Sequence, residues 1–229
     1  MQAADVMTRD VITVASTACV QDAARLLLDH RISGLPVVDE NGRLVGMVSE
    51  GDLIRRPENH TERRPSWWIE FLTPRETLAR EFTYTHSRRI ADVMTREVIT
   101  AAPDTPLSEI AELLEKNRIK RVPIVEDGRI VGIVSRANLL HGLVALSKEP
   151  AALSVADKQL RESVMARLRA EPWARLSLVN VVAHAGTIDL WGIVDSEAER
   201  KALRVAVEIT PGVKAVNDNL MVMPLPRAV

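Results

Sequence analysis

The strongest constraint on this chain is a long internal repeat. The offset between the copies is 87 residues and falls to 86 beyond Asn41, with 16 identities over residues 5–40 and 7 over residues 42–54. A repeat of this length means that the chain folds one structural unit twice. The matching pairs are DVMTRDVIT (5–13) with DVMTREVIT (92–100), HRISGLPVVD (30–39) with NRIKRVPIVE (117–126), and GRLVGMVS (42–49) with GRIVGIVS (128–135).

Each repeat has the pattern of a strand, a helix, two strands and a second helix. The β-branched runs VITV and VITA predict the first strand, and apolar residues at helical spacing follow. PVVDENGRLVGMV and PIVEDGRIVGIV each place two apolar runs around a glycine turn, which predicts a hairpin. A small sheet of this kind has one uncovered apolar face, so we expect the two β-α-β-β-α units to bury their sheets against each other as a pseudo-twofold pair.

Residues 57–89 connect the two repeats and contain Pro57, Pro65 and Pro74. Long connections without secondary structure are uncommon, so we expect short helices here. The apolar cluster in this linker has two interpretations: it packs on its own domain, or it forms a dimer or partner contact. Its members are Trp67, Trp68, Phe71 and Leu72.

The pattern changes at about residue 151. An amphipathic helix (VADKQLRESVMARLRA) is followed by two alternating strands around Ala185 and Gly186, and then by Ser196 and Glu199 in a capping-box pattern. A second helix and a last strand (VKAVNDNLMV) complete a small α+β module. We expect Gly186 to serve a turn and Gly192 a close backbone approach.

Composition limits the possible functions. The chain has 229 residues, 46% hydrophobic and 27% charged, which is ordinary for a globular protein. Lys and Arg number 20 against 22 Asp and Glu up to residue 150, and 10 against 9 beyond it, so neither part is basic enough for phosphate-dominated nucleic-acid binding. Cys19 is the only cysteine, which excludes a disulfide within the chain. The N-terminus is unlike a secretory leader, and no run approaches 18 apolar residues, so we expect a cytoplasmic protein.

Residues that could support catalysis or hold a metal are not grouped in the sequence. None of the five histidines has zinc-ligand spacing with another. Phosphate-loop, dinucleotide and nucleophile-elbow motifs are absent. We therefore expect a protein that is not an enzyme, without catalytic or metal-binding residues and without an obligatory cofactor.

The repeated turn is the sharpest candidate for a binding site. GMVSEGDL (46–53) and GIVSRANL (132–139) place Ser49 and Ser135 at the end of a strand, with Asp52 or Asn138 three residues further on. One interpretation is an ordinary capping box. The other is a strand-to-helix turn that offers backbone amides to phosphate and a carboxylate to a ribose diol. The duplication favours the second interpretation, because two such turns would flank one cleft.

The two repeats resemble a tandem pair of CBS domains, the module named after cystathionine β-synthase. DVMT, the LPVVD and VPIVE strands, and GMVSEGD with GIVSRAN carry the resemblance. It implies CBS repeats at 1–56 and 90–147 whose central cleft binds AMP, ADP, ATP or S-adenosylmethionine. It also implies that the motif Ser meets phosphate, the motif Asp meets ribose, and the residues before the strand proline line the adenine pocket. The first implied site comprises Thr13, Leu35, Pro36, Ser49 and Asp52, and the second comprises Thr100, Val122, Pro123, Ser135 and Asn138.

Lys120 and Arg121 precede the strand of the second repeat, where the first repeat has Ser33 and Gly34. They are either a solvated basic pair or the groups that neutralise the phosphates of a nucleotide whose ribose Asp52 holds. Asn138 departs from the family pattern. A hydrogen bond to a charged acceptor is worth about 1.5–3 kcal/mol and a neutral one about 0.5–1.5 kcal/mol, so we expect the second site to be weaker by about 1 kcal/mol.

Residues from about 153 to 223 resemble a BON domain, for which we set boundaries of 151–226. AHAGTIDLWGIVDS, EAERKAL and ITPGVKAVNDNL carry this resemblance. It implies attachment to a phospholipid surface or to another protein; in the first case the protein would be peripheral to the inner face of a membrane. The net charge near +1 gives only weak attraction to anionic lipid, so a partner protein is an equal alternative.

Together these features predict a regulatory sensor that binds an adenosine nucleotide, forms a homodimer through its CBS pair and contacts a membrane or partner through its BON domain. The alternative is a ligand-free scaffold that uses both modules only for interaction. A transcription-linked regulator is disfavoured by the charge and by the lack of a recognition-helix motif.

The proposed role of Lys120 and Arg121 is testable by replacing both with alanine. If they neutralise phosphate, nucleotide affinity falls and its dependence on salt flattens, because exposed charges act through screened attraction. Calorimetric titration at two ionic strengths measures both quantities. Unchanged affinity and unchanged salt dependence would show that the pair is merely solvated.

Overall fold

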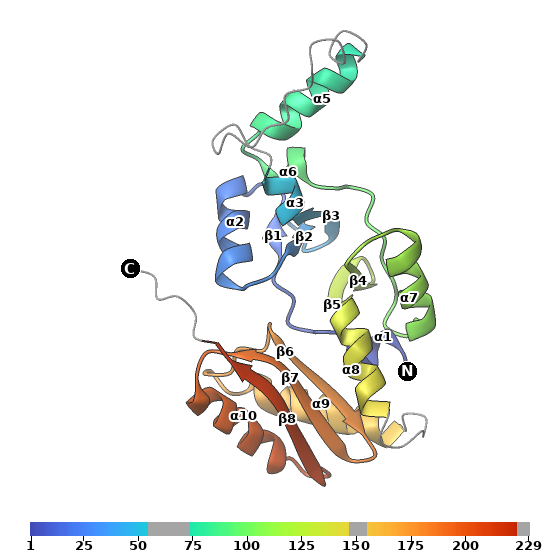
Figure 1. Ribbon diagram of the computed structural model, residues 1–229, viewed down its shortest axis with the longest axis vertical. Coiled ribbons are helices and arrows are strands. Elements are labelled where there is room, and N and C mark those ends of the chain that lie inside the picture. The colour runs from blue at the N-terminus through green and yellow to red at the C-terminus, as the bar shows by residue number, and fades with distance from the viewer. Residues whose placement is uncertain (55–73, 147–154, 224–229) are drawn as a thin grey trace. The chain divides into compact units, whose positions relative to one another are not determined.

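The computed structural model describes residues 1–54, 74–146 and 155–223 (Figure 1). The linker cluster of Trp67, Trp68, Phe71 and Leu72 lies outside these ranges. The chain divides into two compact units, one of Ile12–Val98 and the other of Met1–Val11 with Ile99–Val229. The first unit therefore holds most of the first repeat, whereas the second holds most of the second repeat and the C-terminal module.

The unit of Ile12–Val98 has the predicted order of strand, helix, strand, strand and helix. Its elements are β1 (Val14–Ala15), α2 (Val20–Asp29), β2 (Gly34–Val38), β3 (Leu44–Ser49) and α3 (Glu50–Leu53). Strand β2 pairs in parallel with β1 and antiparallel with β3. Helices α5 (Arg75–His86) and α6 (Ile90–Val93) follow, which confirms the expectation of helix in the linker.

The core of this unit follows from the apolar spacing. On α2, Val20, Ala23 and Leu27 are buried, because residues three and four apart share one helix face. They pack with side chains of the sheet and of α6, so the short helix behind the linker belongs to this core. The buried members from the sheet and α6 include Leu35, Val37, Val48, Ile90 and Val93.

The second repeat keeps the helix, the hairpin and the last helix, but its predicted first strand is wrong. Near VITA the structure has only an isolated bridge between Ala101 and Ile124. In the first repeat, the Ser16 N–H extends the pairing by donating to the Val38 carbonyl at 2.9 Å. The matching residue is Pro103, which has no N–H to donate, so the pairing stops. The elements present are α7 (Leu107–Lys116), β4 (Arg121–Glu126), β5 (Arg129–Ser135) and α8 (Arg136–Leu146).

The two DVMT segments are exchanged between the repeats. Thr8 and Ile133 share two backbone hydrogen bonds of 3.0 and 2.9 Å, and Thr95 and Met47 share two of 2.8 Å. Each DVMT segment therefore lies against the hairpin of the other repeat. Gly132 faces Met7 so closely that a Cβ would overlap the methionine sulfur, and Gly46 faces Met94 in the same way.

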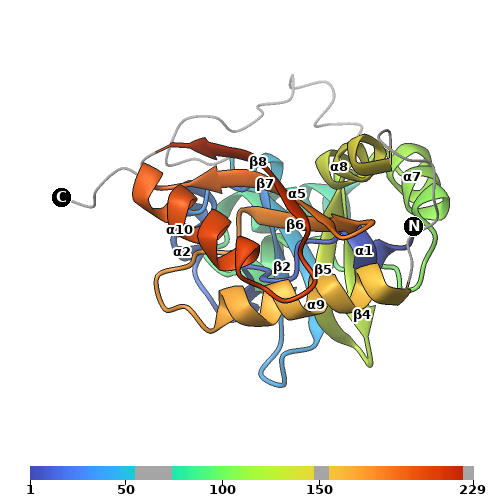
Figure 2. The same ribbon diagram turned by 90° about the horizontal axis from the view of Figure 1, so that it is seen from below.

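The C-terminal module is a three-stranded sheet with two helices. Strand β6 (Val179–His184) pairs antiparallel with β7 (Thr187–Val194), which pairs in parallel with β8 (Ala215–Val222). Helices α9 (Val155–Arg169) and α10 (Glu197–Glu208) lie along this sheet (Figure 2). Their apolar sides share one core with the sheet, which includes Val164, Leu168, Ile188, Leu190 and Leu203. The predicted order of helix, hairpin, helix and strand is confirmed.

Local details of this module also match the sequence. The β6–β7 turn has positive φ at Ala185 (49°) and Gly186 (82°). The Ser196 hydroxyl accepts the Glu199 N–H at 3.1 Å, as expected of a helix cap. Gly192 has φ of 129°, and a Cβ there would collide with the Leu178 carbonyl oxygen. Both glycines are therefore structural.

Candidate functional site

In the first repeat, the turn GMVSEGDL is a capping box built on Ser49 and Asp52. The Ser49 N–H and hydroxyl both donate to Asp52 Oδ2 at 2.7 Å. Because β3 ends at Ser49 and α3 begins at the next residue, the carboxylate lies at the positive end of the short helix. The capping interpretation is thus confirmed for this copy.

The other oxygen of Asp52 has a partner that the sequence did not reveal. The Tyr84 hydroxyl on α5 donates to Asp52 Oδ1 at 2.6 Å. The two residues are 32 positions apart, and no motif connects them. The linker helix therefore contacts the residue for which the CBS resemblance implies a ribose contact.

The remaining candidate residues of the first repeat lie on β2 or directly before β1. Thr13 is half-buried and directly precedes β1. Strand β2 carries Leu35 and Pro36, and the pairing places Gly34 opposite Ser49 and Leu35 opposite Val48. The Leu35 side chain is fully buried in the core, so it stabilises the sheet.

In the second repeat, the corresponding turn has the same capping geometry with a different second function. The Ser135 N–H and hydroxyl donate to Asn138 Oδ1 at 2.8 and 2.6 Å. The Asn138 amide donates in turn to the Val6 carbonyl at 2.9 Å. A carboxylate has no such donor, which gives a structural reason for asparagine at this position. Asn138 is only 5% exposed, so its amide is committed to the fold.

The other candidates of the second repeat lie around its hairpin. Arg121 pairs with Ser135 across β4 and β5, and Lys120, just before β4, is exposed. Val122 and Pro123 are buried. Thr100 is exposed and precedes Ala101, whose N–H donates to the Pro123 carbonyl at 3.1 Å. The structure thus places the candidates of each repeat on or beside the strands of their own repeat, and Gly34 and Arg121 lie opposite the serines of the two turns.

The N-terminal segment Met1–Val11 contains the short helix α1 (Ala3–Val6), whose last carbonyls are buried. The final carbonyls of a helix have no partner within it and need donors from elsewhere. The Val6 carbonyl accepts the amides of both Asn138 and Asn180. The second repeat and the C-terminal module therefore bind the same backbone oxygen.

Arg161 supplies the remaining donors to this segment. Its guanidinium donates to the carbonyls of Ala4 and Met7 at 2.8 Å and to that of Val181 at 2.6 Å. The residue is only 4% exposed. Burial, with a smaller contribution from the nearby Arg9, lowers the pKa of Arg161 to about 10, so the group keeps its charge at neutral pH. One cation thus joins α9, β6 and the N-terminal segment.

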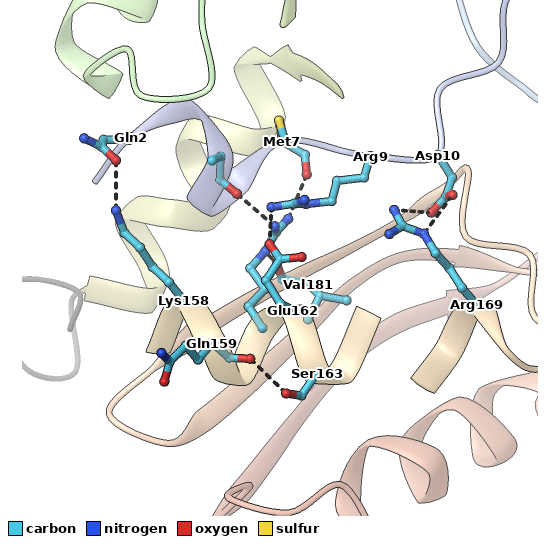
Figure 3. A network of polar contacts seen from close by, with 12 residues as sticks. Gln2, Met7, Arg9, Asp10, Lys158, Gln159, Glu162, Ser163, Arg169 and Val181 are labelled. Atoms are coloured by element: carbon cyan, nitrogen blue, oxygen red, sulfur yellow. Dashed lines mark hydrogen bonds and ion pairs between the residues drawn. The ribbon is translucent and has the colours of Figure 1, made fainter. Parts of the chain in front are cut away.

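More exposed polar pairs also join the N-terminal segment to α9 (Figure 3). Lys158 Nζ donates to Gln2 Oε1 at 2.9 Å, Arg9 pairs with Glu162, and Arg169 pairs with Asp10 at 3.2 Å. Exposed pairs of this kind contribute roughly 0–1 kcal/mol each. They fix the register of the segment on α9, whereas the buried contacts carry most of the stabilisation.

An aromatic contact also links the second repeat to the C-terminal module. His141 of α8 stacks on Trp191 of β7 with ring centroids 4.8 Å apart and an angle of 11° between the planes. Burial lowers the pKa of His141 below its ordinary value of 6.5. His141 Nδ1 is buried and has no hydrogen-bond partner among the described residues. The stack therefore favours the neutral ring.

In the second copy of this segment, residues 91–96, a backbone carbonyl receives its hydrogen bond from within the segment. The Ala91 carbonyl, which corresponds to that of Ala4, accepts the Arg96 guanidinium at 2.7 Å. Arg96 corresponds to Arg9, which pairs with Glu162 instead. The same sequence thus caps its own helix in one copy and contacts the C-terminal module in the other.

The sequence did not predict the hydrogen bonds made by three residues. These residues are Tyr84, Arg161 and Asn180. Arg161 carried a usable signal, because it lies beside Leu160 on the buried side of an amphipathic helix. A charged residue in that position needs partners when it is buried. Asn180 and Tyr84 carried no comparable signal, since their partners are distant in the sequence.

The described ranges hold neither a metal-ligand cluster nor a membrane-spanning helix. No group of three or more His, Cys, Asp and Glu side chains there is arranged to hold a metal ion. Among the helices within those ranges, none combines the length and the hydropathy needed to cross a bilayer.

Comparison with protein families agrees with this architecture. The CBS domain family matches residues 3–59 and 90–145, and the BON domain family matches residues 156–224. The chain therefore belongs to the CBS-domain family, with two CBS segments that form a CBS pair and a C-terminal BON domain.

Similar proteins come from archaea and plants. Uncharacterized protein MJ1426 of Methanocaldococcus jannaschii is 34% identical over 151 residues, which cover 61% of this chain and 89% of that protein. The chloroplastic CBS domain-containing protein CBSX2 of Arabidopsis thaliana is 31% identical over 157 residues, which cover 63% of this chain and 64% of the relative.

A solved structure of CBSX2 in complex with AMP is also similar. It matches with a TM-score of 0.54 and 30% identity, over 62% of this chain and 96% of that one. The likeness confirms the predicted CBS fold and shows that a relative with this fold binds AMP.

Arg161 should be essential for holding the BON domain on the N-terminal segment. Replacing it with methionine leaves buried carbonyls without donors, and we expect a loss of about 3 kcal/mol in the free energy of unfolding. Replacing Arg169 with glutamine is the matched control, with an expected loss below about 1 kcal/mol. Urea denaturation monitored by tryptophan fluorescence measures both, and equal losses would contradict the central role of Arg161.

His141 should make the stability of the contact between the second repeat and the BON domain sensitive to acid. Its pKa in the folded protein lies below 6.5, so the unfolded chain binds more protons as the pH falls. The stability due to the neutral ring is present above pH 6.5 and is lost as the pH drops below it. Thermal unfolding between pH 5 and 8 tests this, with His141→Phe keeping an aromatic stack but losing this part of the pH dependence. An identical pH profile in the variant would contradict the prediction.

Proposed function

We propose that this protein is a non-enzymatic regulator that binds an adenosine nucleotide through its CBS pair. The observation that carries the proposal is the Ser49–Asp52 turn, in which a carboxylate stands at the start of a helix directly after a strand. The AMP complex of CBSX2 supports this ligand class. AMP, ADP, ATP and S-adenosylmethionine are the candidates to compare.

The proposal assigns the two turns unequal roles. Asp52 is half-buried and keeps acceptor capacity, since a carboxylate offers about four lone-pair positions. Asn138 is buried, and its amide holds the Val6 carbonyl. The first turn is therefore the principal ribose site, with Thr13, Leu35, Pro36 and Ser49 around it. The second repeat offers Thr100, Lys120, Arg121, Val122, Pro123 and Ser135.

The BON domain is the proposed output of the regulator. The segment that Arg161 and Asn180 hold continues along the chain directly to Thr13. A ligand that favours one conformation of Thr13 would bias the contacts of the BON domain only if the two conformations differ in affinity for it. We propose that the output is contact with a membrane or a partner protein, in a homodimer located in the cytoplasm.

A ligand-free scaffold remains the second candidate. It is favoured by the observation that Asp52 and Asn138 both have hydrogen-bond partners within the chain. In this function the CBS pair would mediate dimerisation, and the polar groups of both turns would serve only as caps. A ligand titration separates it from the regulator.

The regulator should be stabilised by nucleotide. A ligand at 100 times its Kd stabilises the folded state by about 2.7 kcal/mol, so AMP or a related compound should raise Tm in a thermal-shift screen. Asp52→Asn should weaken binding by about tenfold, because a charged acceptor is lost. Asp29→Asn on the exposed end of α2 is the matched control. Two equal sites, or an unaffected Asp52→Asn variant, would contradict the unequal roles, and no stabilisation by any compound would favour the scaffold.

A surface of the BON domain suits the proposed membrane contact. Trp173, Val205 and Ile209 are exposed, and with Arg167 and Lys201 they line a hollow of about 420 Å³. Vesicles containing phosphatidylglycerol should co-sediment the full chain, and Val205→Glu with Ile209→Glu should reduce the bound fraction several-fold. Leu28→Glu changes an exposed apolar residue elsewhere and serves as the control. If the wild type does not co-sediment, the membrane alternative fails and the partner protein remains.

A further inference from the structure

The acceptor positions of Asp52 are almost all occupied. Ser49 donates twice to Oδ2, and Tyr84 donates once to Oδ1 at 2.6 Å. A carboxylate has about four acceptor positions in total, so roughly one remains. A ribose diol that donates two hydrogen bonds needs two.

Tyr84 is held in place by packing as well as by its hydroxyl. Its ring is partly buried against the core of the unit Ile12–Val98. Beyond α5, the chain is fixed by the N–H groups of Ile90 and Ala91, which donate to the carbonyls of Ala18 and Ser16 at 3.0 and 3.1 Å. The end of the linker helix is therefore anchored to the repeat that carries Asp52.

A phenol hydroxyl and a ribose hydroxyl present the same donor to a carboxylate. A short hydrogen bond to an ionised acceptor is stronger than a neutral one. The Ser49 N–H is fixed by the backbone at the start of α3, whereas the Ser49 hydroxyl can rotate toward another acceptor. Tyr84 is the donor to Asp52 that comes from outside the turn, so a diol can replace it without breaking the backbone cap.

We propose that Tyr84 gates the first nucleotide site, so that a ribose diol displaces its hydroxyl from Asp52. This inference rests on the proposed nucleotide binding and adds its regulation. Ligand binding then releases a tie between the linker helix α5 and the turn that starts α3. The free protein has a reduced apparent affinity, because only the fraction with Tyr84 displaced is competent to bind.

The gate belongs to the first repeat. In the second repeat the corresponding residue, Asn138, is 5% exposed and donates to the Val6 carbonyl. That contact holds the N-terminal segment and does not compete with a ligand. The two copies of the turn therefore divide the work between a gated site and a fixed joint.

Tyr84→Phe tests the gate, because it removes the hydroxyl and keeps the packed ring. We expect AMP to bind about tenfold more tightly to this variant, as the loss of a competing hydrogen bond to a charged group implies. 3′-Deoxyadenosine monophosphate, which lacks the diol, should gain little. Phe82→Leu changes an exposed residue of the same helix and should leave AMP affinity unchanged.

A second measurement follows the tyrosine itself. Tyr84 is the only tyrosine of the chain, so tyrosine labelled with ¹³C at Cζ gives one resonance. In the free protein, Asp52→Asn should move this resonance, because the charged acceptor is lost. Adding AMP to the wild-type chain should also move it, in the direction of a phenol without a carboxylate partner.

The outcomes separate the gate from the proposed function. Tighter AMP binding by Tyr84→Phe, with little gain for the deoxy compound, supports the gate. Equal or weaker AMP binding by this variant, or a resonance that AMP leaves in place, overturns the gate while nucleotide binding stands. If neither the wild type nor Tyr84→Phe binds any adenosine compound, the proposed function fails and the gate fails with it.

Discussion

The buried carbonyls of α1 need hydrogen-bond donors from outside the helix. The packing of the second repeat and of the BON domain against the N-terminal segment depends on this need. A four-residue helix cannot satisfy its own last carbonyls, and burial removes water as a partner. Arg161, Asn138 and Asn180 provide the missing donors from two different modules. Leaving one such group unpaired costs about 1–3 kcal/mol, so the N-terminal segment, the second repeat and the BON domain are held in one arrangement.

The repeat contains two copies of one turn, and the exchange of Asp52 for Asn138 gives them different contacts. Asp and Asn both accept from the Ser at the helix start, so both preserve the cap. Only Asn can donate, and it uses this donor to bind the Val6 carbonyl. Asp keeps a negative charge, which Tyr84 contacts in this structure and which suits a ribose diol in the proposed complex. The exchange of one carboxylate oxygen for an amide nitrogen thus distinguishes a structural contact at Asn138 from a candidate ligand site at Asp52.

The contacts between the N-terminal segment, the second repeat and the BON domain include two groups whose pKa values are lowered by burial. Arg161 is a buried cation with a lowered pKa, and His141 is a half-buried ring whose desolvation lowers its pKa and favours the neutral form. Groups of this kind tolerate little rearrangement, because displaced partners would leave charge or polar atoms unpaired in a medium of low dielectric constant. The N-terminal segment therefore behaves as part of the BON domain and of the second repeat at once.

The sequence by itself determined the units and their order. The 87-residue repeat gave two related modules, alternation and glycine turns gave both hairpins, and Ser196 with Glu199 marked the last helix. Local patterns suffice for these features because strand, turn and cap preferences act between near neighbours. The missing first strand of the second repeat was a local error, since Pro103 removes the donor that Ser16 supplies.

Only the tertiary structure decided which copy each segment joins. Met7 lies against Gly132 and Met94 against Gly46, although every residue of the DVMT motif is identical in the two copies. The partners of Asp52 and of the Met7 carbonyl were likewise invisible, because Tyr84 and Arg161 are distant from them in the chain and follow no motif. Hydrogen-bond satisfaction of buried groups is a property of the packed structure, and so it, and not the pattern of residues, fixed these contacts.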